Sequence, residues 1–406
     1  MPRRNAFFAA MLLVAGVSAC NDASSSDSTA VAPPPASVVP DLEAIAASIV
    51  NESAAVREGE QVAIMGGIRD FELLENIATQ VSRAGGDPLV IVNSERIVRR
   101  YYDEVDAKYD TMPGQWSKAM SELADVVILV DLNETPDLLA HVPAERRAAR
   151  TRADAVGQEI FLKRGVRQVE VGNDMYPTHA RASRFGLSRD ELAAFFWGAL
   201  QASPDAIREN SEKLKGLLAG ARELHVTDPH GTDLRVRLLP GVTPFANDGA
   251  ISPEEVRGGE QFAYLPAGEV YTRVSPEGTS GVIVSDRQPY QGKFIEDFTL
   301  RVENGQITEM TAKSGLEPFR ALIDAHSADL QRLSVVDFGV NPGLKATASE
   351  QLRTWVPEGM FTIAFGNDTW VGGTNTVPLV LPVSIPDATV RIDDRVVIEN
   401  GVLKLP

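Results

Sequence analysis

The chain has 406 residues, of which 44% are hydrophobic, so it can bury a large core and is long enough for two or three domains. This composition excludes an intrinsically disordered protein. The formal net charge of −17 and the lack of basic clusters argue against nucleic acid as a partner, because phosphate binding requires clustered cations.

The first twenty residues have the pattern of a bacterial lipoprotein signal. Arg3 and Arg4 precede an apolar run, Phe7 to Val17, that is too short to span a bilayer, and the run leads into Val-Ser-Ala-Cys20. Cys20 is the only cysteine, which rules out an intrachain disulfide and favours lipidation. We therefore predict a lipid anchor that holds the protein at the periplasmic side of the bacterial cell envelope. An ordinary cleaved signal with an incidental cysteine is the alternative.

Residues 21–40 are rich in Ser, Asp and Pro and too poor in apolar side chains to pack, so they are predicted to form a disordered tether.

Helical and strand patterns alternate over residues 41–222. The predicted helices are Leu42–Val56, Asp70–Arg83, Ala144–Leu162, Ser188–Gln201 and Pro204–Ala219. The predicted strands are Gln61–Met65, Pro88–Val92, Val126–Val130 and Val166–Val171. The continuous apolar runs at Pro88–Val92 and Val126–Val130 are typical of strands buried on both faces. This region is therefore predicted to be a parallel α/β domain.

Strand patterns dominate residues 223–406. They begin with Leu224–Val226 and Arg235–Leu239. Asn304-Gly305 and Asn400-Gly401 are each flanked by strand residues, which predicts two hairpins because both residues tolerate a positive φ angle. A β-rich second domain is expected.

Five short segments of this second half carry a family resemblance. They are Gly231-Thr-Asp-Leu234, Leu265-Pro-Ala-Gly-Glu-Val270, Phe338-Gly-Val-Asn-Pro342, Gly359-Met-Phe-Thr-Ile-Ala-Phe-Gly366 and the stretch from Gly372 to Pro382. Their order and spacing resemble those of the thermophilic-type metallo-aminopeptidases, the aminopeptidase T group, whose framework is also used by iron-dependent dihydroxypyridine dioxygenases. Before Gly231 the resemblance is sparse and includes Pro177-Thr-His-Ala180. It implies an N-terminal parallel α/β domain followed by a β-rich domain with the metal-site region.

The resemblance assigns metal ligands to five positions, and only Glu269 keeps a ligand-type side chain. The second Glu falls on Val335, the two His on Thr362 and Val380, and the Asp on Pro382. Tyr264 replaces an Asn, and Thr369 stands where the peptidases place a Tyr. Zinc, cobalt and ferrous iron need imidazole and carboxylate ligands, so we expect no bound metal.

Other polar residues could rebuild a site. Asp337 lies two residues beyond Val335 and would face the same side of a strand. The residues expected to line the former cleft are Glu269, Asp337, Asn341, Asn375, Asp233 and His230, with a rebuilt His230–Asp233 pair as one option. The five histidines, the single Cys and the serines show no metal-binding or nucleophile motif. Glu269, left without a cation, is predicted to have a raised pKa.

Three functional hypotheses follow. The first is a lipid-anchored, non-catalytic binder of a peptide or small molecule. The second is an enzyme: a metallo-aminopeptidase using zinc, cobalt or iron, or a hydrolase using Glu269 with Asp337 or His230. The third is a structural partner subunit of an active relative, and the resemblance also implies a homodimer as the candidate assembly.

Overall fold

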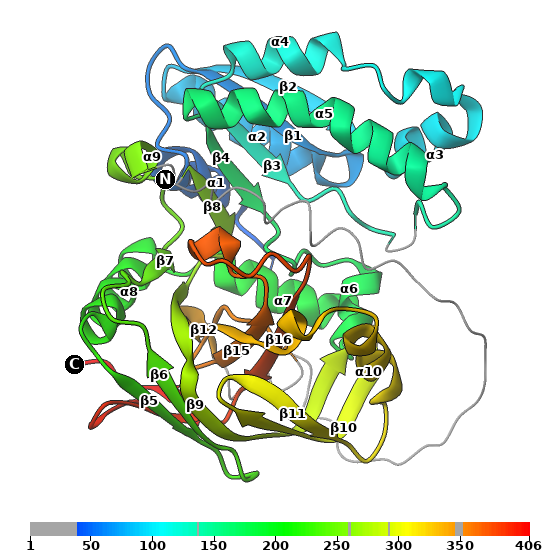
Figure 1. Cartoon of the computed structure of the whole chain (residues 1–406). Helices are drawn as coiled ribbons and strands as arrows, with labels where there is room; N and C mark the ends of the chain where they lie inside the picture. Colours follow the sequence, from blue (N-terminus) through cyan, green and yellow to red (C-terminus); the bar gives the residue numbers. More distant parts are fainter. Residues whose placement is uncertain (1–38, 136–137, 259–260, 291–292, 346–351) are drawn as a thin grey trace.

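A computed structural model describes residues 39–406 except 136–137, 259–260, 291–292 and 346–351. The predicted signal with Cys20 and nearly all of the predicted tether lie outside the described residues. Figure 1 shows an α/β part, drawn uppermost, above a part dominated by antiparallel strands. The arrangement confirms the predicted fold class.

The α/β part is built on one parallel sheet. Its strands have the order β2-β1-β3-β4-β8 and are all paired in parallel. Their bounds are Gln61–Gly67 for β1, Asp87–Asn93 for β2, Val126–Val130 for β3, Arg167–Val171 for β4 and Phe262–Leu265 for β8. Strand β8 lies beyond residue 222, so the chain returns to the first sheet from within the β-rich half.

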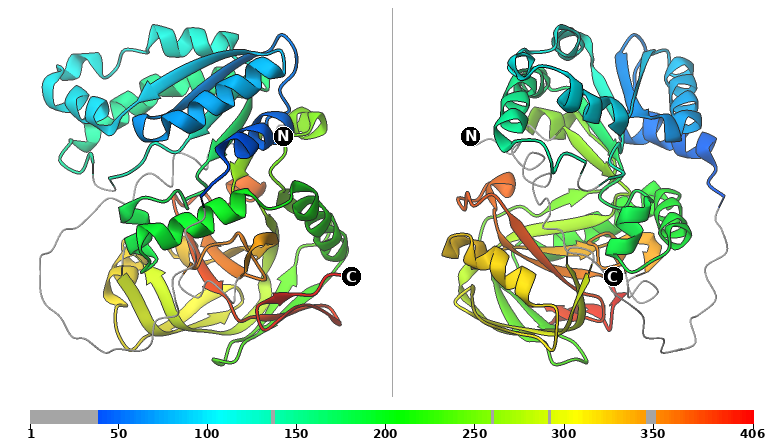
Figure 2. Two further views of the ribbon diagram at one scale, coloured as in Figure 1. Left: turned by 180° about the vertical axis from the view of Figure 1, so that it is seen from behind. Right: turned by 90° about the vertical axis from the view of Figure 1, so that its right-hand side faces the viewer.

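Helices cover both faces of this sheet (Figure 2). The helices of the α/β part are α1 (Leu42–Ser48), α2 (Phe71–Arg83), α3 (Glu95–Glu104), α4 (Gln115–Leu123), α5 (Ala144–Arg164), α6 (His179–Arg184), α7 (Arg189–Leu200) and α9 (Pro253–Gly258). Helix α8 (Pro204–Leu218) packs instead on the second sheet, because its Leu214 and Leu218 belong to the core of that sheet. Residues Ile49–Ser53 continue α1 as a short π-helix. Helices α1, α2 and α7 pack on one face with Ile64 and Ile128, whereas α4 and α5 pack on the other with Ala63 and Val127.

The prediction that Pro88–Val92 is buried on both faces is wrong. This strand, β2, lies at the edge of the sheet, where Leu89 is 57% and Val92 38% exposed. Helix α3, which follows it, buries none of its residues and so does not cover the strand. Periodicity cannot separate this edge strand from the central β3, whose apolar run is buried as predicted.

The second sheet is antiparallel and contains twelve strands among the described residues. Its main path is β16-β15-β12-β9-β6-β5-β17-β18-β19, and β7, β10 and β11 branch from it through β9. The strands are β5 (Glu223–Thr227), β6 (Asp233–Leu238), β7 (Phe245–Asn247), β9 (Glu269–Tyr290), β10 (Lys293–Glu303), β11 (Gln306–Thr311), β12 (Leu333–Gly339), β15 (Phe361–Gly366), β16 (Val380–Ile385), β17 (Thr389–Ile392), β18 (Arg395–Glu399) and β19 (Val402–Leu403).

Both predicted Asn-Gly hairpins are present, joining β10 to β11 and β18 to β19. Helix α10 (Glu317–Asp324) and the short parallel pair β13 (Asn341–Lys345) and β14 (Pro357–Glu358) complete this half.

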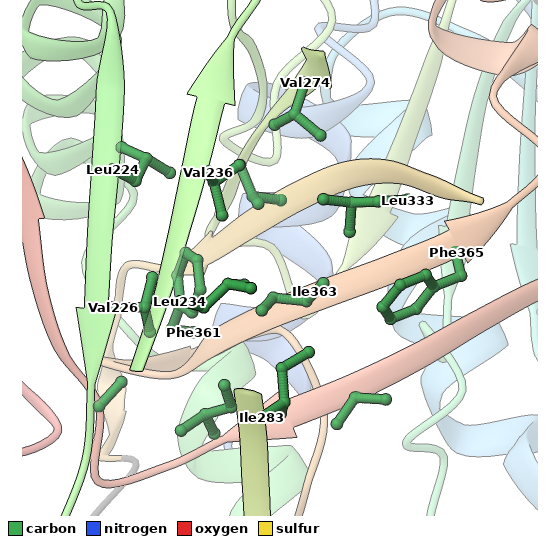
Figure 3. Packing of buried hydrophobic residues seen from close by; sticks show 14 of the residues in the cluster. Leu224, Val226, Leu234, Val236, Val274, Ile283, Leu333, Phe361, Ile363 and Phe365 are labelled. Atoms are coloured by element: carbon green, nitrogen blue, oxygen red, sulfur yellow. The ribbon is translucent and has the colours of Figure 1, made fainter. Parts of the chain in front are cut away.

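Strand alternation gives β9, β12, β15 and β16 two different faces. One face carries Val270, Val336, Ile363, Phe365 and Val383, which belong to the large core. Figure 3 shows part of this core, with Ile363 and Phe365 labelled. Since successive side chains on a strand point to opposite faces, the residues between them lie on the other side. We call that side the junction face; it carries Glu269, Tyr271, Asp337, Thr362 and Val380.

Candidate functional site

Glu269 is placed where the two sheets join. Strand β8 of the parallel sheet ends at Leu265, and Pro266-Ala267-Gly268 connects it directly to β9, whose first residue is Glu269. Gly268 has a φ of 119°, and a Cβ atom there would lie 2.5 Å from the Cβ atom of Asn341. Glycine is therefore required at this turn. The turn fixes Glu269 beside the carboxyl end of the first sheet.

Neutral amides hold the Glu269 side chain, which is only 7% exposed. Asn247 Nδ2 donates to Glu269 Oε1 at 2.7 Å and to the Tyr264 carbonyl oxygen at 2.8 Å. Burial raises the pKa of Glu269 to about 7, although the amides of Asn247 and Asn173 favour the ionised form. The predicted raised pKa is thus confirmed.

Asp337 shares the junction face with Glu269. It lies opposite Tyr271 on β9 and opposite Thr362 on β15, while Glu269 lies opposite Gly339. The two carboxylates are therefore diagonal neighbours on adjacent strands. Burial raises the pKa of Asp337 well above its usual value, and the negative charge of Glu269 raises it further. Among the described residues, its buried Oδ1 atom has no hydrogen-bond partner.

The positions that the resemblance assigned to metal ligands do fall on this one face, but three of them, Val335, Val380 and Pro382, are apolar. Val335 is buried against Ala364 and Val371, with Val380 packed beside them. Pro382 lies opposite Ala364 in the next strand. The hydroxyl oxygen of Thr362 is 3.2 Å from that of Ser384, with which it shares a hydrogen bond.

This donor set does not fit a transition metal. Glu269 and Asp337 supply the carboxylates of the junction face, and no imidazole accompanies them among the described residues. Over the same part of the chain, no group of three or more His, Cys, Asp or Glu side chains is arranged to hold a metal ion. Zinc sites in proteins use three or four such ligands.

The other four predicted cleft residues serve the fold, and Asn341 does so directly beside Glu269, at the Gly268 turn. Asn341 is fully buried and donates to the carbonyl oxygens of Ala199 and Ala267 at 3.1 and 2.6 Å. Asn375 donates to the Asp329 carbonyl oxygen at 2.7 Å. Their family motifs mark structural turns.

Asp233 and His230 do not form the rebuilt pair that the sequence suggested. Asp233 Oδ1 lies 2.8 Å from His225 Nε2, and His230 Nε2 lies 3.9 Å from Asp387. Strand register puts Asp233 opposite Val282, far along β9 from Glu269.

An ionic network at the carboxyl edge of the parallel sheet was not predicted from the sequence. Arg69, after β1, donates to Asp70 at 2.9 Å and to the Asp131 carbonyl oxygen at 2.5 Å. Arg181 pairs with Asp131 at 2.6 Å, and the Tyr176 hydroxyl donates to Asp70. A usable signal exists, because Asp70 and Asp131 closely follow parallel strands, whose carboxyl ends meet at one edge.

Two further titratable groups connect this network to Glu269. Glu170 on β4 lies opposite Tyr264 on β8. Burial raises the pKa of Glu170 to about 8, and the charges of Asp131 and Asp174 add to the shift while Arg181 opposes it. Burial also raises the pKa of Tyr264, with contributions from Glu170 and Glu269. Glu170, Tyr264 and Glu269, which connect the first sheet to the second, therefore all have raised pKa values.

His179, from the loosely matching Pro177–Ala180 segment, lines a separate hollow of about 660 Å³ at the turn between α6 and α7.

None of the helices in the described part of the chain has the length and apolar character needed to cross a bilayer.

Comparison with known proteins agrees with this architecture. The chain is 25% identical over 236 residues to aminopeptidase AmpS of Bacillus subtilis, an alignment that covers 53% of this chain and 56% of that relative. The chain thus spans little more than half the length of that curated relative.

Two solved structures share the fold. AmpT from Thermus thermophilus superimposes with a TM-score of 0.65 at 20% identity, covering 90% of this chain and 99% of that one. The 2,5-dihydroxypyridine dioxygenase of Pseudomonas putida gives 0.58 at 16% identity, covering 90% and 97%. The family model described as thermophilic metalloprotease (M29) matches residues 39–337, and the chain therefore belongs to that family.

Proposed function

We propose that this protein is a lipid-anchored binding protein that uses the M29 fold without metal-dependent hydrolysis. One observation carries the proposal: the junction face, where the family resemblance puts the metal ligands, has two carboxylates, and the same strands contribute to an apolar cluster of Val335, Val371, Val380 and aromatic side chains. Such a surface lacks the imidazoles that a borderline metal needs but offers charge and apolar area to an organic ligand. The ligand is a peptide or small molecule, and the assembly is a homodimer.

The deciding experiment combines metal content with turnover. The purified protein is dialysed, its zinc, cobalt, manganese and iron are measured, and hydrolysis of amino-acid amides is followed with each metal added. We expect less than 0.1 equivalent of metal, as an order-of-magnitude limit, and no turnover. About one bound equivalent together with hydrolysis would establish the aminopeptidase alternative instead.

The carboxylate pair itself favours a second candidate function, a metal-independent hydrolase. Two carboxyl groups with raised pKa values on one face are able to act as general acid and base. Turnover of amides that survives chelation and disappears in Glu269→Gln and Asp337→Asn would support it. Co-purification with an active relative would instead support a partner-subunit role.

The proposed location depends on Cys20. Since Cys20 is the only cysteine, Cys20→Ala should release the protein from the membrane fraction after a salt wash. Retention of the variant on the membrane would contradict lipid anchoring at this residue.

A further inference from the structure

The exposed apolar side chains of this molecule are concentrated in one region. Among the described residues, all but two of the exposed large hydrophobic side chains lie between residues 68 and 156, in the α/β part. Four of them belong to helix α4 and its neighbourhood: Leu89 on β2, Met112 just before the helix, and Trp116 and Leu123 on it. We call these four the outer surface. Figures 1 and 2 show α4 at the end of the molecule away from the antiparallel sheet, so the outer surface is remote from the junction face.

Helix α4 turns its largest apolar side chains away from the protein. Trp116 and Leu123 are seven residues apart, hence on one side of the helix, and are 90% and 67% exposed. The side that contacts α5 carries Ser117 and Ser121, and a Cβ atom on Gly157 of α5 would lie 2.8 Å from Ser121 Oγ. A helix on the surface of a globular protein normally buries its apolar side instead. The pattern of α4 therefore calls for an apolar phase outside the chain.

The sheet beside α4 is also incompletely covered. The core under α4 and α5 contains five buried residues among those described, whereas the core on the opposite face contains thirty. Met120 of α4 and Met65 of β1 pack at the margin of the small core. Strand register places Leu89 and Ile91 of β2 beside Ala63 and Met65, facing the same side. Since α3 buries none of its residues, the margin stays open, and the outer surface continues it.

Strand pairing with another protein is disfavoured at this edge. The Asp87 N–H on β2 donates to the Glu60 carbonyl oxygen at 2.8 Å, on the β1 side. Backbone groups of successive residues point to alternate edges of a strand, so Pro88 faces outward. Proline has no N–H to donate, and at an edge it blocks the addition of a further strand.

Charge and side-chain type favour a lipid surface over an acidic or basic partner. Residues 108–123 contain two lysines and two acidic residues, so this segment is neutral in a chain of net charge −17. Tyr109 and Trp116 are both exposed, and rings of this kind combine an apolar body with a polar tip, which suits the boundary between water and lipid. The outer surface protrudes, and a fluid bilayer accepts protruding side chains without a matching pocket.

The predicted tether gives this surface access to a bilayer. Residues 21–38 separate Cys20 from the described part of the chain and can span roughly 60 Å when extended. A folded domain of this size has a radius of gyration of only about 21 Å. We propose that the outer surface docks on a zwitterionic lipid surface and inserts Met112, Trp116 and Leu123 among the headgroups, as a second contact besides the acyl anchor. This inference deepens the proposed membrane location and rests on it for proximity to the bilayer.

The test uses Trp116 as its own reporter. The mature chain from residue 21 onward, which keeps every described residue and lacks signal and lipid, is mixed with phosphatidylcholine vesicles whose acyl chains carry bromine, a short-range quencher of tryptophan emission. We expect partial quenching, most of which disappears in Trp116→Phe, while the protein still sediments with the vesicles. Leu123→Ser and Met112→Ser should each lower the partition coefficient by about tenfold. Because the segment is neutral, about 0.5 M NaCl should change the coefficient by less than about twofold.

Controls separate this surface from general apolar adhesion. Val402, an exposed apolar residue on β19 of the second sheet, is the matched control, and Val402→Ser should leave the partition coefficient unchanged. Thermal unfolding of each variant verifies that it folds. Vesicles that leave the emission of the mature chain unquenched, or equal partitioning of Leu123→Ser and the unmodified chain, would overturn the inference. A dimer in sedimentation equilibrium that Leu123→Ser dissociates, without quenching by vesicles, would assign the outer surface to a second copy instead.

A failure of this inference differs from a failure of the proposed function. If Cys20 holds the full chain on the membrane while the mature chain ignores vesicles, the lipid contact is wrong and the anchored location stands. If the mature chain binds vesicles but hydrolyses amino-acid amides, the non-catalytic function is wrong and the lipid contact stands.

Discussion

The two sheets treat buried charge in opposite ways where they meet. At the carboxyl edge of the parallel sheet, Asp70 and Asp131 are each matched to an arginine and the tyrosine hydroxyl of Tyr176 adds a donor. On the junction face of the antiparallel sheet, Glu269 and Asp337 are held by neutral groups only. The first arrangement is internally complete and stabilises the fold, whereas the second is complete only with something bound or with protons added.

The largest expected effect is a gain in metal affinity when metal ligands are restored to the junction face. The variant Thr362→His/Val380→His/Pro382→Asp would give the junction face four ligands together with Glu269. With about 3–4 kcal/mol per ligand, a single carboxylate corresponds to a zinc dissociation constant of about 1 mM, whereas four ligands reach the nanomolar range or tighter. Elemental analysis after dialysis measures the gain, and Thr362→His alone is the graded control. A tightly bound equivalent in the unmodified protein would contradict our assignment of the ligand positions.

A smaller effect, on the free energy of unfolding, is expected from breaking the buried ion pair between Arg181 and Asp131. Arg181 is 13% and Asp131 4% exposed in their side chains. Removing the guanidinium by Arg181→Met leaves a buried carboxylate unpaired and should lower the free energy of unfolding by about 3–5 kcal/mol. Urea denaturation measures the loss. Arg208→Met, which disrupts a more exposed pair with Asp205, is the matched control and should change stability by less than about 1 kcal/mol. Similar losses in the two variants would mean that the buried Arg181–Asp131 pair contributes no more to stability than an exposed pair.

Glu170 is expected to make the stability of the protein depend on pH. Its folded pKa of about 8 exceeds the unfolded value of about 4.3, so the folded state holds this proton more tightly. The stabilisation is fully present below pH 4 and is lost as pH rises through 8. In Glu170→Gln the fall in stability between these limits should become shallower, by up to about 5 kcal/mol over the window, because the two pKa values differ by almost four. Urea titrations at pH 5, 7 and 9 would show it, and an unchanged slope would mean that Glu170 titrates normally.

The smallest effect is expected at Glu269. Because its pKa is raised to about 7, the folded state favours the neutral form, and this contribution to stability declines as pH rises from about 4.3 to 7. Glu269→Gln keeps the hydrogen-bonding shape without the charge and should be neutral or stabilising by up to about 1 kcal/mol near pH 7. Chemical denaturation measures the difference. A loss of several kcal/mol would reveal a bound ion or a charged partner at this position.

Local patterns predicted most of the elements. Val126–Val130 appears as β3 with the same bounds, and the Asn304-Gly305 and Asn400-Gly401 hairpins form where positive φ angles are tolerated. The edge position of β2 was not predictable, since it depends on the order of the strands in the sheet. The pairing of β8 with the first sheet was not predicted either, because a strand of four residues has too short a pattern to indicate which strand it pairs with.

The candidate site was predictable only for residues whose positions follow from alternation along a single strand. Alternation along β12 put Asp337 on the same side as Val335, and the motif order put Glu269 near it. Asn341 and Asn375 belong to equally good motifs but serve backbone turns, a difference that depends on three-dimensional contacts. The Arg69–Asp70–Asp131 network joins residues from loops after different strands, so it becomes visible only once the strand order is known.

The return of β8 to the parallel sheet also limits how this molecule can be divided. A fragment ending at residue 222 would lack β8 and would leave β4 as an open edge with unpaired backbone groups, an arrangement prone to intermolecular pairing. The remaining fragment would begin with strands of the second sheet and carry β8 without its neighbour. The two halves are therefore interdependent parts of one cooperative unit, and separate expression is expected to yield aggregates rather than two soluble domains.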